Sequence, residues 1–134
     1  MMCQIQPDWD SPTKILGIAF FRRTWANSLV VDFLATHPAV QGKISGIGIA
    51  LLDFIVGVAT AIKASSVWGE TTKNSVRFYE KAFGRDRFGD RFFLPKSRFS
   101  SFRTDVSTKQ LSKLTQKLEQ VLPTQPQQSK LRSE

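Results

Sequence analysis

The sequence is poor in the residues that carry most catalytic and metal chemistry. Its 134 residues include one cysteine, Cys3, and one histidine, His37. A lone cysteine cannot form an internal disulfide, which excludes a small scaffold held together by disulfide bonds. No Cys/His cluster offers a zinc-type site, and no nucleophile stands beside a recognisable base. We therefore predict no catalytic residue, no metal and no cofactor, and hence a protein that is not an enzyme.

Two further patterns are missing from the chain. The glycines of residues 42–48, GKISGIG, match neither standard spacing of a phosphate-binding loop. The first residues, MMCQIQPDWD, are acidic and contain no apolar run, so they do not resemble a secretory signal. The sequence offers no signature for a small-molecule substrate, and we predict none.

Positive charge, by contrast, is abundant and unevenly placed. The formal net charge is +8. Residues 1–62 carry four basic and four acidic residues, whereas residues 63–134 carry 15 basic and seven acidic ones. Such an asymmetry indicates an acidic partner. We predict an anionic membrane surface or an acidic protein, with nucleic acid as the alternative.

The longest apolar stretch is residues 44–62, in which ten of 19 residues are Leu, Ile, Val or Phe. These ten favour membrane insertion by about 3–6 kcal/mol, and Asp53 at the centre opposes it by roughly 2.5–3.5 kcal/mol. Hydropathy therefore leaves two interpretations open, a membrane-inserted helix and the core helix of a soluble domain. Small residues four apart favour close helix packing in lipid. The residues predicted to insert or to form this core are Gly46, Ala50, Asp53, Gly57 and Ala61.

This stretch is predicted to be one arm of an apolar helical hairpin. The first arm is a helix over residues 13–36, because Pro12 suits a helix start and the pair His37-Pro38 ends it. A buried aspartate must be neutral or paired. The fold-back of the hairpin places Arg23 close to Asp53, so we predict an ion pair between them.

The hairpin is extended at its carboxyl end. Residues 70–83 either continue the second arm or form a third helix, and Gly84 stops the helix in both cases. The hairpin and its extension together occupy residues 12–83, after a flexible N-terminus at residues 1–11.

Residues 84–105 are interpreted as a basic, aromatic-rich segment that is mostly loop. Arginines interleaved with phenylalanines suit anionic lipid headgroups, or nucleic acid through phosphate contacts and base stacking. A third interpretation is that the phenylalanines fill a core while the arginines are solvated. The predicted anion contacts are Arg85, Arg87, Arg91, Lys96, Arg98 and Arg103. The predicted aromatic contacts are Phe88, Phe92 and Phe93.

The last predicted element is an amphipathic helix over residues 106–122. Ser107 with Gln110 fits a capping box, and leucines at helical spacing make one apolar face. Residues 123–134 are too polar to pack and are predicted to be disordered.

Together these patterns predict an all-α protein: an apolar helical hairpin, a basic aromatic segment and a short amphipathic helix. The predicted role is a small, non-enzymatic, membrane-associated protein or an assembly subunit. Its hairpin anchors, and its basic half contacts anionic headgroups or an acidic protein on the cytoplasmic side. The alternative is a soluble, cytoplasmic, all-α module that binds nucleic acid through the basic aromatic segment.

Overall fold

The computed structural model describes residues 1–5, 15–38, 46–84 and 89–121. Strands and helices alternate along these residues. In chain order they are β1 (Met2–Ile5), β2 (Gly17–Arg23), β3 (Leu29–Thr36), α1 (Ile47–Ala61), β4 (Ser66–Glu70), α2 (Val76–Phe83), β5 (Arg91–Pro95), the 3-10 helix η2 (Lys96–Arg98) and α3 (Phe99–Val121). The fold class is α/β, so the prediction of an all-α protein is wrong.

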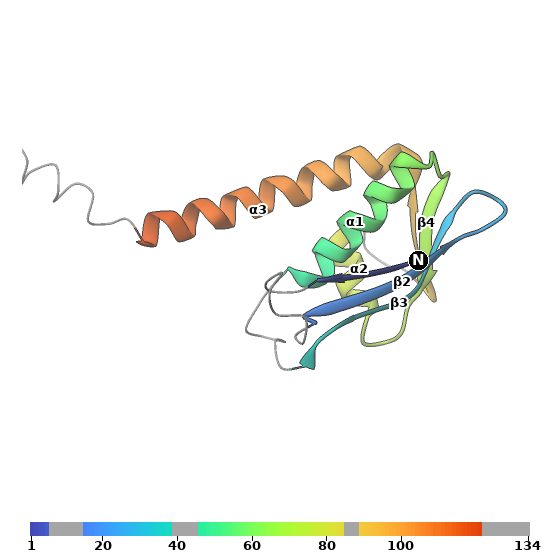
Figure 1. Ribbon diagram of the computed structural model, residues 1–134, viewed down its shortest axis with the longest axis horizontal. Coiled ribbons are helices and arrows are strands. Elements are labelled where there is room, and N and C mark those ends of the chain that lie inside the picture. Colours follow the sequence, from blue (N-terminus) through green and yellow to red (C-terminus); the bar gives the residue numbers. More distant parts are fainter. Residues whose placement is uncertain (6–14, 39–45, 85–88, 122–134) are drawn as a thin grey trace, which may run out of the picture. The chain divides into compact units, whose positions relative to one another are not determined.

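The strands form one mixed sheet in the order β1-β2-β3-β4-β5. Neighbouring strands are antiparallel except for β3 and β4, which are parallel. A parallel pair needs a crossover connection, and α1 lies on that connection (Figure 1). This β3–α1–β4 unit indicates where a ligand would bind, because ligands of open α/β sheets bind beyond the carboxyl ends of the strands.

Residues 15–36, within the predicted first helix, form the antiparallel hairpin of β2 and β3. The turn is closed by a hydrogen bond of 2.8 Å from the Thr24 N–H to the Ser28 carbonyl oxygen. Asn27 takes a left-handed conformation, with a φ of 59°, and its side-chain amide donates to the Lys63 carbonyl oxygen. The polar centre of the predicted helix is therefore a turn, and its β-branched and aromatic flanks suit strands. The predicted helical hairpin is wrong.

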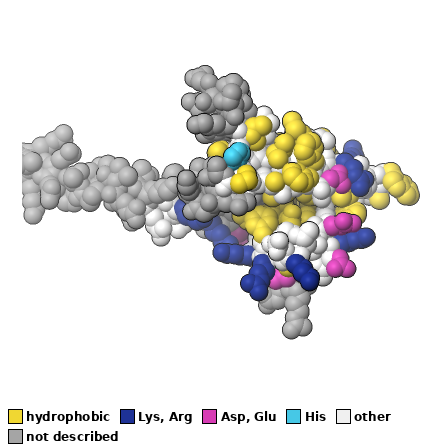
Figure 2. Space-filling model, turned by 90° about the horizontal axis from the view of Figure 1, so that it is seen from below, with side chains coloured by type: hydrophobic (Ala, Val, Ile, Leu, Met, Phe, Trp, Pro, Cys, Tyr) yellow, Lys and Arg dark blue, Asp and Glu magenta, His cyan; other side chains and the backbone are white. Residues whose placement is uncertain are grey.

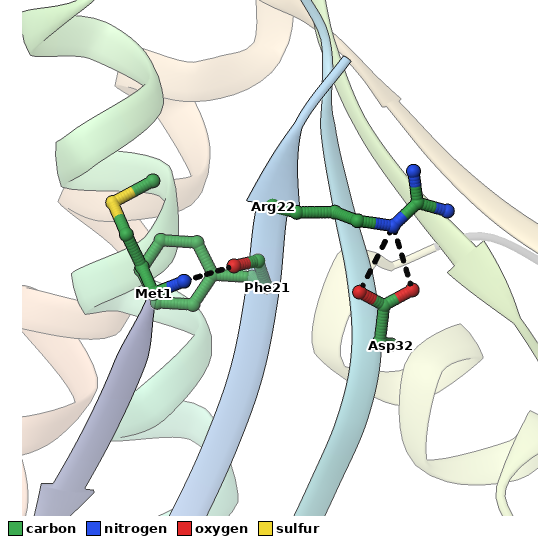
Figure 3. A network of polar contacts seen from close by, with 4 residues as sticks. All are labelled: Met1, Phe21, Arg22 and Asp32. Carbon is green, nitrogen blue, oxygen red and sulfur yellow. Dashed lines mark hydrogen bonds and ion pairs between the residues drawn. The ribbon is translucent and has the colours of Figure 1, made fainter.

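Figure 3 shows two polar contacts made by neighbouring residues of β2. The Met1 amino group donates to the Phe21 carbonyl oxygen at 2.9 Å. On the neighbouring strands the Arg22 Nε donates to both carboxylate oxygens of Asp32, at 3.2 and 3.1 Å. These contacts join β2 to its two neighbours.

The predicted inserting stretch contains α1, a helix of 15 residues. It lies against one face of the sheet, where a Cβ on Gly17 would come within 2.5 Å of Ile47 and 3.1 Å of Leu51. Leu51 and Leu52 are fully buried in the resulting core. No helix in the described ranges is long and apolar enough to cross a membrane. The predicted membrane anchor and membrane-associated location are therefore wrong.

An aromatic cluster joins α2 to the same face of the sheet. The rings of Tyr79 and Phe83 lie 4.1 and 5.5 Å from that of Phe92, which is fully buried in β5. Phe83 also lies 5.2 Å from Phe102 of α3. α2 ends at Gly84, whose φ of 63° is left-handed. Residues 76–83 therefore form the separate third helix that the sequence allowed, and it ends where predicted.

Two further segments differ from their predictions. Residues 2–5, in the predicted flexible N-terminus, form strand β1. Residues 91–98, in the predicted loop, form β5 and η2. The chain as a whole divides into two compact units, Met1–Arg103 and Thr104–Glu134. α3 begins in the first unit and ends in the second.

The predicted C-terminal helix exists, but it begins earlier than predicted. α3 starts at Phe99, so Ser107 lies inside the helix and does not cap it. The predicted disordered tail lies outside the described residues.

Candidate functional site

The predicted pair of Arg23 and Asp53 is not formed, because each residue has another partner. Arg103 Nε donates to Asp53 Oδ1 at 3.1 Å. Arg23 Nε donates to Asn27 Oδ1 at 3.0 Å within the β2–β3 turn. Asp53 is thus paired, as a partly buried carboxylate requires, but by an arginine 50 positions further along the chain.

The other predicted anion contacts do not gather into one patch. Arg91 lies over the Trp68 ring, 5.3 Å from its centroid. Arg98 donates to the Phe83 carbonyl oxygen at 3.3 Å, and Lys96 is exposed. Arg85, Arg87 and Phe88 lie outside the described residues. Phe92 belongs to the core, whereas Phe93 is half-exposed on the opposite face of the sheet.

The predicted small residues of α1 serve different purposes. A Cβ on Gly57 would meet the Arg103 guanidinium at 3.1 Å, so this glycine makes room for the arginine that pairs with Asp53. Ala50 is half-buried and Ala61 is exposed. Gly46 is the N-cap of α1 and has a φ of 90°, a conformation that side chains other than glycine rarely adopt.

A different region stands out, the end of the sheet where the pairing of β3 and β4 stops. The last parallel pair is Val31 with Gly69, one residue before β4 ends at Glu70, whereas β3 continues to Thr36. Just beyond Val31 the pairing of β3 with β2 skips Asp32, which makes Asp32 the extra residue of a β-bulge. A bulge bends its strand. Among the described residues, the β4-facing edge of β3 therefore has no strand partner from Asp32 to Ala35.

Gly69 is the last residue of β4 that pairs with β3. A Cβ there would come within 2.6 Å of the Phe92 ring and 2.9 Å of the Val31 carbonyl oxygen. Only glycine fits between these two neighbours. The last paired residue of β4 is therefore packed against both the core aromatic cluster and β3.

The N-terminus of α1 lies at the same edge of the sheet. A Cβ on Gly48 would lie 3.7 Å from Leu34 of β3 and 2.9 Å from Phe78 of α2. The first hydrogen bond of the helix runs from the Ala50 N–H to the Gly46 carbonyl oxygen at 2.9 Å. The amides before Ala50 are thus not used inside the helix. No acidic residue stands in its first turn, so the positive end of the helix dipole is not neutralised there.

Tyr79 supplies a polar group to this region. Its side chain is only 6% exposed, and its ring stacks on Phe92, which touches Gly69. Its hydroxyl makes no hydrogen bond to the part of the chain described. No fully buried side-chain oxygen there lacks a partner, so this hydroxyl must reach solvent. Burial raises the pKa of Tyr79 above its usual value, which keeps the phenol protonated at neutral pH.

Neither the N-terminus of α1 nor Tyr79 was predicted from the sequence as part of a site. Residues 46–48 were interpreted as the interior of a long apolar helix, and Tyr79 was not singled out. The available signal was an apolar β-branched run, a loop with glycines, and an apolar helix, which is the order of a β-α unit. The structure shows no group of three or more metal-ligating side chains in its described ranges.

The sequence matches no protein-family model, and no curated protein resembles it. Solved structures do resemble the fold. An acetyltransferase from Bacillus cereus ATCC 14579 is 22% identical with a TM-score of 0.52, over 60% of this chain and 54% of that one. Tetrahymena GCN5 is 13% identical with a TM-score of 0.53, over 71% of this chain and 68% of that one.

A candidate GNAT-family acetyltransferase from Desulfovibrio desulfuricans is 25% identical, with a TM-score of 0.50 over 63% of each chain. The chain spans little more than half the length of the Bacillus cereus protein. These likenesses contradict the predictions of a non-enzymatic protein and of no small-molecule substrate, since the structures with this fold are acetyltransferases. The described residues adopt the fold of GNAT acetyltransferases.

Proposed function

We propose that this chain binds acetyl-coenzyme A and transfers its acetyl group to a nucleophilic acceptor. One observation carries the proposal. The pairing of β3 with β4 ends beside the bulge at Asp32, at the end of the sheet where α1 begins, in a fold shared with acetyltransferases. The carboxyl edge of a parallel strand pair is where α/β sheets bind their ligands.

The residues present fit the chemistry of this ligand. Its phosphates are anionic, and the amides that precede Ala50 lie at the positive end of the α1 dipole. Gly46 brings no Cβ to this position, and nothing would lie within 4 Å of one. The edge of β3 from Asp32 to Ala35, which no described strand pairs on the β4 side, offers backbone groups to the amides of the coenzyme's flexible arm.

Tyr79 is the proposed proton donor. In acyl transfer the acceptor attacks the thioester carbonyl carbon, the carbon–sulfur bond breaks, and the departing sulfur takes a proton. The acceptor loses its own proton to solvent. A phenol that is held protonated by burial suits the donating role, and its ring is fixed by stacking on Phe92.

The experiment compares two glycines with the same backbone requirement. Gly46 and Gly84 both have a positive φ, and a Cβ on either meets nothing within 4 Å. Replacement by alanine therefore costs each about 1 kcal/mol of backbone strain. Only Gly46→Ala changes the N-terminus of α1. By titration calorimetry with acetyl-coenzyme A, we expect Gly46→Ala to weaken binding about tenfold and Gly84→Ala to leave it unchanged.

Two outcomes would contradict the proposal. One is that wild-type protein binds no acetyl-coenzyme A at millimolar concentration. The other is that both glycine variants bind as tightly as the wild type, which would remove the α1 N-terminus from the site.

A further inference from the structure

The sheet has a second face that no described helix covers. α1 and α2 pack on the face that carries Gly17 and Phe92. Cross-strand partners share a face, so the register assigns the partners Phe20 and Phe33, and Phe93 beside Trp68, to the other one. We call this second face, with its flanking charged residues Arg22, Asp32, Glu70 and Arg91, the open sheet face.

The open sheet face is aromatic and exposed. Phe20, Phe33 and Phe93 are 43%, 50% and 47% exposed, respectively. The rings of the first two lie 6.1 Å apart. Figure 2 shows the molecule from below the view of Figure 1. Hydrophobic side chains are gathered on this side, and charged side chains lie around them. An exposed apolar patch of this kind marks an interaction site.

The charges of the open sheet face balance within the face itself. Arg22 is paired with Asp32 at 3.1 Å. Arg91 stands opposite Glu70 in the register and lies over Trp68. A chain of net charge +8 thus presents one face with two basic and two acidic residues. This face does not complement an acidic partner, whereas it matches another surface that is equally neutral and apolar.

We propose that the open sheet face is the interface of a homodimer, in which the faces of two copies pack on each other. Sheets that twist in the same sense pack face to face at about 10 Å, with strands within about 30° of alignment. A two-fold axis brings the same surface of each copy together. Two identical faces have identical twist and balanced charge, so a second copy of this chain meets both requirements.

The area of the open sheet face can be compared with the area that a dimer interface buries. Five strands about 4.8 Å apart, with about 3.3 Å per residue, make a face roughly 20 Å by 20 Å. A standard interface buries about 800 Å² from each partner. A flat face of this size covers about 400 Å², so the dimer needs the whole face, including the flanking charged residues, and is smaller than a standard interface. The pair of Phe20 and Phe33 lies among its central apolar contacts.

The test uses two equally exposed phenylalanines. Phe33 lies on the open sheet face, and Phe54, which is 51% exposed, lies on α1. By sedimentation equilibrium we expect wild type and Phe54→Ser to form a dimer, and Phe33→Ser to raise the dimer dissociation constant tenfold or more. A wild-type monomer at all concentrations would overturn the proposal and leave the face to a different protein. A Phe33→Ser dimer as tight as the wild type would place the interface elsewhere.

A cross-linking experiment covers the case in which Phe33→Ser fails to fold. In a Cys3→Ser background, Phe33→Cys and Phe54→Cys each introduce the only thiol of the chain. We expect mild oxidation to give a disulfide-linked dimer in Phe33→Cys and none in Phe54→Cys. Equal cross-linking in both variants, or larger open-ended assemblies, would contradict a closed two-fold interface at this face.

Discussion

At the residue scale, Tyr79 is the side chain whose chemistry can be followed most directly. It is the only tyrosine of the chain, so the tyrosine absorbance change in an alkaline titration reports on it alone. Burial raises its pKa, and we expect the titration midpoint of the folded protein to lie above the usual value of about 10. A midpoint at or below that value would contradict the buried placement of the ring.

The same shift gives the sign of a stability effect. Because the folded state disfavours the phenolate, the unfolded state ionises first, and wild-type stability should fall as the pH rises above about 10. Tyr79→Phe should lack this fall in urea unfolding. At neutral pH the variant should match the wild type in stability, because the hydroxyl makes no hydrogen bond within the described part of the chain. It should lose acetyl transfer by about 10²-fold or more if Tyr79 donates the proton.

Asp53 shows what sequence reasoning at this scale can and cannot supply. The need for a partner follows from the aspartate and its apolar neighbours, and the structure does pair it. Its partner is Arg103 at 3.1 Å, and not Arg23. The choice between two arginines depends on which segment lies beside α1, and no local pattern contains that information.

At the element scale, the packing of β4 against β3 and the core depends on Gly69. A Cβ there would press on the fully buried Phe92 ring and on the Val31 carbonyl oxygen. Neither can yield, because the ring is stacked on Tyr79 at 4.1 Å and the carbonyl belongs to the sheet. Overpacking of this kind costs about 1–3 kcal/mol.

We therefore expect Gly69→Ala to lower the free energy of unfolding by about 1–3 kcal/mol, measured in urea. Gly89→Ala is the matched control, since a Cβ at Gly89 would meet nothing within 4 Å and its φ is not positive. The control should be as stable as the wild type. If the two variants were equally stable, the close packing of Gly69 against Phe92 and Val31 would be refuted.

Element prediction failed for a physical reason at residues 15–36. Short apolar runs fit a buried helix and a buried strand equally well. The residues from Thr24 to Ser28 were interpreted as the polar centre of a helix, yet they form a turn in which Asn27 has a φ of 59°. The apolar stretch of residues 44–62 was long enough to indicate a helix, and α1 occupies 15 of its residues.

At the scale of the whole molecule, the two faces of the sheet differ. One face is sealed by helices, and the other exposes phenylalanine rings. If the second face closes a dimer, unfolding is coupled to dissociation, and stability must depend on protein concentration. We expect the wild-type melting temperature to rise as the protein concentration is increased a hundredfold, and that of Phe33→Ser to be lower than the wild type at each concentration at which the wild type is dimeric. A wild-type melting temperature that does not change with concentration would count against the dimer.

The sequence by itself determined the positive charge of the second half, the helices within residues 47–61 and 76–83, and the end of α2 at Gly84. These features depend on composition and on contacts between near neighbours in the chain. Only the tertiary structure decided that β3 and β4 lie side by side, that Asp32 forms a bulge beside the end of their pairing, and that Tyr79 stands next to Phe92. Such contacts join residues far apart in the chain, and they form because burying both apolar surfaces together stabilises the fold more than any local preference does.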